Sequence, residues 1–498
     1  MRIFSWTVFF LLCLTGIWWI VEPVFSGEYA LLASFDDDAF YYFKVAENIV
    51  AGYGSTFNGI HQTNGYHPLW MILLVFLDWL AEKSGAEFLE MVRIGIALLY
   101  MLFLFFSFLF IQKVRNRNDG FFDYFYLAFC AGFYVLIAGG GMEVALTLPL
   151  IALLFLLFIS DTSISWLIIV GALTVLSRLD SVIVVAPFFF YLLWVNRLRF
   201  SEILPGILVA AVMVLSYIVS NLVLFDIPVP VSGFAKSASG FALFSPEPWI
   251  SLFSYVIWRR INLFTFLVLF VAAYVFLKQR KCNKTWFLFT LFLGVILFYL
   301  LTVARSDWQM WPWYFYPDFV AFTFSYLMVS YGMDVPIGRL RFGFLSLLII
   351  LSAVYCSMYA FISPIFNKPE SSRESVLVSR FMDNHPGVYA MGDRAGRIGY
   401  LSHQPLIQLE GLVMDANYLK LLRSHGMTID KLLKIYGVDY YIVSVERNPK
   451  GCYDVVEPYF GGTLTKKVRG TFCVEPYEDF REHENITGLK VFFLSRSE

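Results

Sequence analysis

The chain has 498 residues, of which 59% are hydrophobic and only 15% are charged. Soluble globular proteins carry about 25% charged residues, so this composition excludes an ordinary soluble protein and predicts a polytopic membrane protein. The net charge of −1 creates no basic field for a nucleic-acid partner, and we expect none.

The first predicted element is a long apolar run at residues 3–24, which follows Arg2. The run is long for the apolar core of a secretory signal peptide, and no convincing A-x-A cleavage site follows it. We therefore predict an uncleaved first transmembrane helix.

Three consecutive carboxylates, Asp36, Asp37 and Asp38, come just after this helix. Adjacent acids at a membrane border are costly unless water, a cation or a reacting group compensates them. One reading is that they mark where the helix leaves the membrane. A boundary needs one charge and not three, so we interpret the triplet as part of a functional site.

Runs of about 20 apolar residues can cross a bilayer. The sequence contains about 11 such segments, several of them short: 3–24, 92–112, 121–138, 144–160, 164–178, 182–196, 203–225, 261–277, 285–303, 318–332 and 342–362.

Basic residues predict the orientation of these segments, because cytoplasmic loops are enriched in Lys and Arg. The clusters lie at 113–117, 197–199, 278–284 and 339–341. All fall inside if segment 68–82, which Asp78 interrupts, is an interfacial or re-entrant helix. The N-terminus is then cytoplasmic, and the C-terminus is extracytoplasmic. The alternative is that 68–82 crosses the membrane. The basic cluster at 113–117 then lies outside, which breaks the enrichment of Lys and Arg in cytoplasmic loops at the next connection.

The predicted transmembrane part covers residues 1–362, with a first external loop at 26–91. From about 363 to 498 the pattern changes to short strand-like and helical runs, which predict a small extracytoplasmic α/β domain. Strand-like runs lie at 387–392, 405–412, 438–444 and 489–495, and helical stretches lie at 416–424 and 429–436. If this part is outside the cell, Cys452 and Cys473 are candidates for a disulfide.

The first loop, DDDAFYYFKVAENIVAGYGSTFNGI…TNGYHPLW, resembles the start of GT-C glycosyltransferases. These polytopic enzymes take sugars from polyprenyl-phosphate carriers on the extracytoplasmic face. The matching parts are Asp37-Asp38-Ala39-Phe40, the helical run 41–50, and His67-Pro68-Leu69-Trp70. The similarity is closest to bacterial members with a DDAF-type start, including arabinofuranosyl- and mannosyltransferase-like proteins. Asp36 departs from that pattern, which leaves the register of the catalytic acid open.

This resemblance implies a polyprenyl-phosphate sugar as donor and a glycan, lipid or protein as acceptor. Because no eukaryotic targeting signal is evident, we expect the protein in a bacterial plasma membrane with its site facing out. A general base is needed to take the proton of the acceptor hydroxyl. We favour Asp37, which matches the first acid of the family motif; Asp38 is the near rival, and Asp36 comes third. The metal is unknown: the triplet could accommodate a divalent cation, and no other cofactor is indicated.

The leaving phosphate needs a cationic partner, and Arg178, Lys236 and Arg305 are the candidates that the predicted topology places outside. The alternative for each is snorkelling at the interface or an ion pair, notably Arg178 with Asp180. Further candidates for substrate binding are polar or aromatic residues of the external loops: Glu143, Tyr41, His61 and His67.

The main rival function is a transporter or flippase of lipid-linked glycans. Such proteins carry charges at the membrane midplane and broken helices in both halves of an inverted repeat. Most charges here lie at helix ends, and the sequence lacks such symmetry. An O-antigen ligase and a noncatalytic scaffold are further readings, but neither accounts for the acidic first loop.

Overall fold

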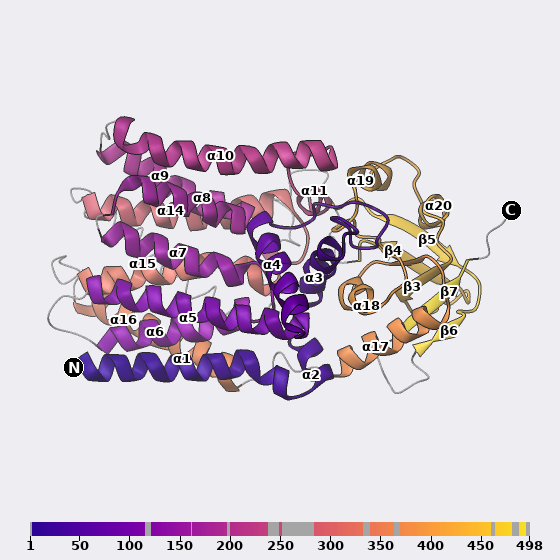
Figure 1. Cartoon of the computed structure of the whole chain (residues 1–498), viewed down its shortest axis with the longest axis horizontal. Coiled ribbons are helices and arrows are strands. Elements are labelled where there is room, and N and C mark those ends of the chain that lie inside the picture. Colours follow the sequence, from indigo (N-terminus) through magenta and orange to yellow (C-terminus); the bar gives the residue numbers. More distant parts are fainter. Residues whose placement is uncertain are drawn as a thin grey trace.

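The computed structural model describes residues 2–114, 121–160, 162–196, 200–237, 249–250, 283–331, 339–362, 369–459, 464–480 and 488–494. Long apolar helices lie side by side in the N-terminal part, and a mixed sheet with short helices forms the C-terminal part (Figure 1).

The long helices correspond to the predicted segments. They are α1 (Arg2–Phe25), α5 (Phe88–Val114), α6 (Phe121–Ala138), α7 (Val144–Ile159), α8 (Ile164–Ser177), α9 (Val182–Asn196), α10 (Phe200–Phe225), α14 (Asn283–Arg305), α15 (Pro317–Tyr331) and α16 (Arg339–Ile362). The predicted segment 261–277 lies outside the described residues.

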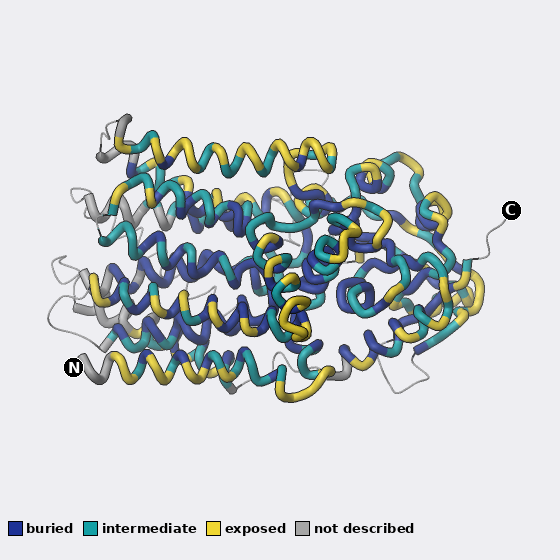
Figure 2. The backbone as a smooth tube through the Cα atoms, in the orientation of Figure 1, coloured by how far each residue is buried: buried dark blue, intermediate teal, exposed yellow. Residues whose placement is uncertain are grey.

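Three of the described helices, α1, α5 and α10, are long and apolar enough to cross a membrane by length and composition. Others are apolar but shorter. In α10 only 6% of the apolar window is buried inside the protein, and its apolar side chains form a largely exposed surface (Figure 2). Such a surface is stable in lipid and not in water, so the chain is a multi-pass membrane protein.

The first loop forms three helices at one end of the bundle: α2 (Glu28–Ala33), α3 (Asp37–Val50) and α4 (Pro68–Ser84) (Figure 1). Pro68 occupies the first turn of α4, where its missing N–H costs nothing, and Gly85 ends the helix with φ of 71°. At this end of the bundle α4 packs against α3, α5 and α8, and its place at the membrane interface stays a prediction.

The C-terminal part begins with α17 (Pro369–Asn384) and contains a five-stranded sheet in the order β2-β1-β3-β7-β6. Strands β1 and β2 are parallel, as are β1 and β3, whereas β7 is antiparallel to β3 and to β6. The strands of this sheet are β1 (Tyr389–Met391), β2 (Leu406–Gln408), β3 (Tyr440–Ser444), β6 (Glu478–Asp479) and β7 (Leu489–Phe493). The short helices are α18 (Ala395–Leu401), α19 (Ala416–Leu422) and α20 (Ile429–Ile435).

The predicted strand-like runs and helical stretches of this part are all found. Strands β4 (Tyr453–Glu457) and β5 (Val468–Phe472), which pair in a separate hairpin, and the two-residue β6 were not predicted. Gly470 and exposed residues interrupt the apolar pattern of β5, which explains its weak sequence signal.

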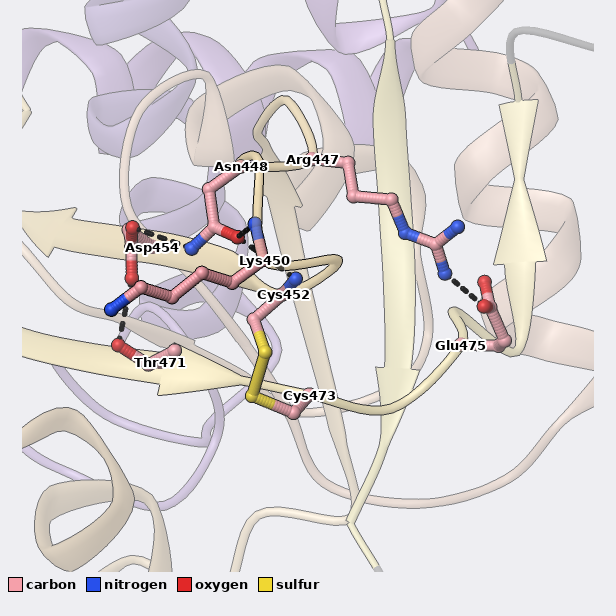
Figure 3. Close-up of a disulfide and its surroundings, with 8 residues drawn as sticks. All are labelled: Arg447, Asn448, Lys450, Cys452, Asp454, Thr471, Cys473 and Glu475. Atoms are coloured by element: carbon pink, nitrogen blue, oxygen red, sulfur yellow. Dashed lines mark hydrogen bonds and ion pairs between the residues drawn. A yellow bond between two sulfur atoms is a disulfide. The ribbon is translucent and has the colours of Figure 1, made fainter.

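The disulfide between Cys452 and Cys473 closes the β4–β5 hairpin (Figure 3). Cys452 directly precedes β4, and Cys473 directly follows β5, so the bond joins the open ends of the two strands. The predicted pairing is confirmed. Cys13, Cys130 and Cys356 are buried and free.

The first loop lies between the bundle and the C-terminal part and is bound to the latter by polar contacts. Thr63 Oγ1 donates to the carbonyl of Met414 at 3.1 Å, and Lys44 Nζ donates to that of Tyr400 at 3.2 Å. The buried apolar side chains of all three parts form one continuous cluster. Residues distant in the sequence therefore meet around α3.

Candidate active site

The acidic triplet lies at the N-terminus of α3. Asp36 is the N-cap residue, and Asp37 and Asp38 occupy the first turn, where the helix dipole favours negative charge. Successive residues of a helix point about 100° apart, so the three carboxylates enter different surroundings.

Asp37 binds the start of α18. Its two carboxylate oxygens accept from the backbone N–H groups of Gly396 and Arg397, each at 3.0 Å. These groups belong to the first turn of α18 and have no partner inside that helix. A Cβ atom on Gly396 would lie 2.1 Å from the carbonyl oxygen of Asp37, so glycine is required for this approach.

Asp36 lies against the bundle. Its N–H donates to the carbonyl of Gly140 at 2.9 Å, and a Cβ atom on Gly140 would lie 1.9 Å from Asp36 Oδ2. Burial, together with the nearby carboxylate of Asp38, raises the pKa of Asp36 to about 7, although Arg93 and Arg397 oppose the shift. Asp36 thus packs against Gly140 in the segment that follows α6.

Asp38 faces a cation. Its Oδ2 lies 3.8 Å from Nζ of Lys236, the residue that follows α11 (Val231–Ala235). The two side chains are 27% and 20% exposed, so the pair is partly open. Lys236 Nζ lies 3.5 Å from the hydroxyl of Tyr314 and 5.8 Å from the ring centroid of Trp308. Burial raises the pKa of the Asp38 carboxyl, and the charge of Lys236 opposes that rise.

A buried ion-pair network lies beside this pair. Arg178 binds Glu143 through Nη1, and it binds Asp180 through Nε and Nη2 at 2.8 and 2.9 Å. The hydroxyl of Tyr42 donates to Glu143 at 3.2 Å, and that of Tyr316 donates to Asp180 at 3.2 Å. Two carboxylates therefore neutralise Arg178, and the Asp180 pairing weighed from the sequence is present.

His67 belongs to the same network. Its Nδ1 accepts from the N–H of Leu179 at 3.1 Å, so the proton of the neutral ring is on Nε2, which lies 3.7 Å from Glu143 Oε1. Burial lowers the pKa of His67, although the carboxylate of Glu143 opposes the shift. This arrangement suits a positioning role in the network.

No protein-family model matches the sequence, and no curated protein matches it. Among solved structures, the chain is similar to ArnT from Cupriavidus metallidurans bound to undecaprenyl phosphate, with a TM-score of 0.50 and 11% identity, covering 93% of this chain and 97% of ArnT. The chain has the GT-C fold. ArnT in the apo state also has a TM-score of 0.50, at 12% identity, over 88% of this chain and 95% of that one.

The mycobacterial arabinofuranosyltransferase AftD is also similar, with a TM-score of 0.49 and 12% identity. The match covers 99% of this chain but 40% of AftD, so this chain spans less than half of that protein. The similarity to the two ArnT structures confirms the GT-C resemblance of the first loop at the level of the fold.

Within this GT-C fold the remaining sequence candidates have partners other than the pair of Asp38 and Lys236. Tyr41 is buried, and Gln408 Nε2 lies 3.4 Å from its hydroxyl. His61 lies against Asn58 and the ring of Tyr436. Arg305 is exposed in the last turn of α14.

Two acids of the C-terminal part were missed from the sequence. Burial and the neighbouring carboxylates of Glu457, Asp38 and Asp393 raise the pKa of Glu410 well above its ordinary value, and Lys236 opposes the shift. Burial raises the pKa of Asp393 to about 6. No local motif marks either residue, because they reach the site only through the docking of the C-terminal part on α3. Among the described residues, no three His, Cys, Asp or Glu side chains are grouped so as to hold a metal ion.

Proposed function

We propose that the chain is a glycosyltransferase that moves a sugar from a polyprenyl-phosphate carrier to a hydroxyl of a cell-envelope acceptor. The observation that carries the proposal is the partly open pair of Asp38 and Lys236, 3.8 Å apart at the end of a GT-C bundle. The ArnT neighbour was solved with undecaprenyl phosphate, which supports a lipid phosphate as the carrier.

The reaction is a single displacement. Asp38 takes the proton of the acceptor hydroxyl, whose oxygen forms a bond to the anomeric carbon of the sugar. The bond from that carbon to the phosphate oxygen breaks, and the electron pair leaves with the polyprenyl phosphate. Lys236 stabilises the negative charge of the leaving phosphate. Attack opposite the leaving group inverts the anomeric centre.

Asp38 replaces Asp37 as our preferred base because of what each carboxylate already binds. Both oxygens of Asp37 accept backbone N–H groups of α18, so this carboxylate already holds the C-terminal part. Asp36 lies between Arg93 and Arg397 on the bundle side. Asp38 retains a partly exposed carboxylate beside a flexible amine.

Lys236 is our preferred phosphate partner. Arg178 is bound by two carboxylates, the buried Glu143 and the partly exposed Asp180, and a phosphate would have to displace one of them. Lys236 contacts Asp38 at the longer distance of 3.8 Å. When a phosphate binds the lysine, Asp38 loses part of its compensating charge, its pKa rises, and it becomes a better proton acceptor.

The proposed location is the inner membrane of a bacterium, with the N-terminus in the cytoplasm. The pair of Asp38 and Lys236 and the C-terminal part then face outwards, where lipid-linked sugars are used. The proposed chemistry needs no divalent cation, and addition of EDTA to a transfer assay tests that point.

The test is sugar transfer from radiolabelled decaprenyl- and undecaprenyl-phosphate sugars in membranes that contain the wild type or a variant at equal expression. We expect Asp38→Asn to lower transfer by about 10²–10⁴-fold, the usual contribution of a general base. Asp430→Asn, an exposed carboxylate of α20, is the matched control and should keep wild-type activity.

Two results would contradict the proposal. If Asp38→Asn transfers sugar as fast as the wild type, Asp38 is not the general base. Wild-type membranes that transfer no sugar from any of these donors, but carry them across the bilayer, would favour the flippase reading.

A further inference from the structure

The C-terminal part contains a cavity of about 530 Å³ at the carboxyl ends of the parallel strands β1 and β3. Residues 392–394 follow β1, residues 444–446 follow or end β3, and β4 closes the opposite side. Ligands of open α/β sheets bind at the carboxyl ends of parallel strands. The volume falls within the range of about 300–1,000 Å³ that is typical of small-molecule sites.

A buried carboxyl group lines this cavity without a complete set of partners. Glu457 is 3% exposed, and its Oε1 accepts from the hydroxyl of Tyr441 at 3.2 Å. Its Oε2 has no hydrogen-bond partner among the residues that the structure describes. An unpaired buried polar atom is destabilising, so a donor from a ligand would stabilise it.

The residue beside the carboxyl group of Glu457 is Gly392, which has no side chain. A Cβ atom on Gly392 would lie 2.0 Å from Oε2 of Glu457, so no side chain can stand between β1 and this carboxyl group. Gly392 therefore packs directly against this carboxyl group, and both residues line the cavity.

The charge of the lining selects the ligand. Four carboxylates line the cavity: Asp393, Glu446, Asp454 and Glu457. Arg394 also lines it but already contacts Glu374 at 3.3 Å and Asp393 at 3.4 Å. Anionic groups are therefore repelled, whereas hydroxyl groups, which donate hydrogen bonds without negative charge, are favoured. Tyr459, which is 64% exposed, adds an aromatic face to the lining.

The cavity is linked to the candidate active site by acidic residues. Glu410 lies close enough to Asp38, Asp393 and Glu457 for each of them to raise its pKa. Asp393, which lines the cavity, is in turn influenced by Asp37 and Asp38. Asp393 thus connects the lining of the cavity to the acidic triplet.

We propose that this cavity binds a sugar unit of the acceptor, with Glu457 accepting hydrogen bonds from sugar hydroxyl groups. That the sugar belongs to the acceptor rests on the proposed function, whereas the binding of a neutral sugar does not. The cavity sets which acceptor glycan is used, while Asp38 and Lys236 carry out the transfer.

The test is saturation-transfer NMR on the full-length protein in detergent, with the methyl glycosides of mannose, galactose, glucose and arabinofuranose as probes. Ser444→Trp fills the cavity from an exposed position at the end of β3, and Glu457→Gln keeps the shape but replaces the carboxyl group with an amide. Glu475→Gln is the control: the same exchange at an exposed carboxylate that pairs with Arg447 (Figure 3).

We expect at least one glycoside to bind the wild type and Glu475→Gln equally. Its signal should fall about tenfold in Ser444→Trp and in Glu457→Gln, the change that corresponds to the loss of one hydrogen bond. Thermal unfolding of each variant shows that it is folded. Asp38→Asn should bind the glycoside like the wild type, which separates this site from the proposed chemistry.

Two results overturn the inference: no glycoside binds the wild type, or Ser444→Trp binds as the wild type does. Neither result bears on sugar transfer, which the membrane assay measures separately. Conversely, sugar binding that is lost in Ser444→Trp would stand even if the chain transferred no sugar.

Discussion

At the scale of single residues, three adjacent aspartates have three different environments. Asp36 faces arginines of the bundle and of α18, Asp37 binds backbone amides, and Asp38 faces an amine. The helical rotation between neighbours produces this division of roles. One carboxylate can thus anchor the C-terminal part while the next remains available for chemistry.

The pairing of Asp38 with Lys236 predicts a pH effect. The positive amine stabilises the Asp38 carboxylate and opposes the rise of its pKa caused by burial. In Lys236→Gln the pKa of Asp38 therefore rises further, so the base is deprotonated only at higher pH. We expect the acid limb of kcat/KM for transfer to move up by about 1 pH unit.

The measurement is kcat/KM against pH for the wild type and for Lys236→Gln in the same membranes. Lys450→Gln, an exposed lysine of the C-terminal part, serves as the control. An acid limb that stays in place when Lys236 is neutralised would show that this lysine does not act on the base.

At the scale of secondary-structure elements, the junction between α3 and α18 joins the first loop to the C-terminal part. The carboxylate of Asp37 serves as the cap of α18 from outside that helix. Capping carboxylates contribute about 0.5–2 kcal/mol to stability.

We expect Asp37→Ala to lower the free energy of unfolding by about 1 kcal/mol, because two helix N–H groups lose their acceptor. Thermal unfolding in detergent measures the change, and Asp430→Ala on exposed α20 is the control. A variant of Asp37 with unchanged stability and no transfer would instead restore Asp37 as the base.

At the scale of the whole molecule, the bundle also holds the C-terminal part through Asp307. One oxygen of this buried carboxylate accepts from the N–H groups of Leu464 and Thr465 at 2.6 and 3.0 Å, and the other binds the Thr465 hydroxyl. Asp307 follows α14, so a bundle helix and the segment before β5 are fastened together.

In Asp307→Ala these N–H groups lose a charged acceptor, and hydrogen bonds to charged groups contribute about 1.5–3 kcal/mol each. We expect hydrogen exchange in the segment from Leu464 to Phe472 to become at least about tenfold faster. Exchange in α5 should not change. Equal exchange in both proteins would show that Asp307 does not anchor the C-terminal part.

The helices of the bundle were predictable because lipid requires long apolar runs, which are visible in any short window of the sequence. The strands β1, β2, β3 and β7 were predictable for a similar reason, since each is a short apolar run bounded by turn residues. The DDAF start also sufficed to indicate the GT-C fold, since it combines an unusual charge density with its position after the first helix.

The contacts that distinguish the acids and the cations from one another were not predictable. The sequence favours Asp37, yet its carboxylate meets α18, which begins more than 350 positions later in the chain. Arg178 and Lys236 look equivalent as isolated cations, but Glu143 and Asp180 neutralise the arginine. Local composition determines what each segment is, whereas the partner of a charged side chain depends on distant segments that come together only in the folded protein.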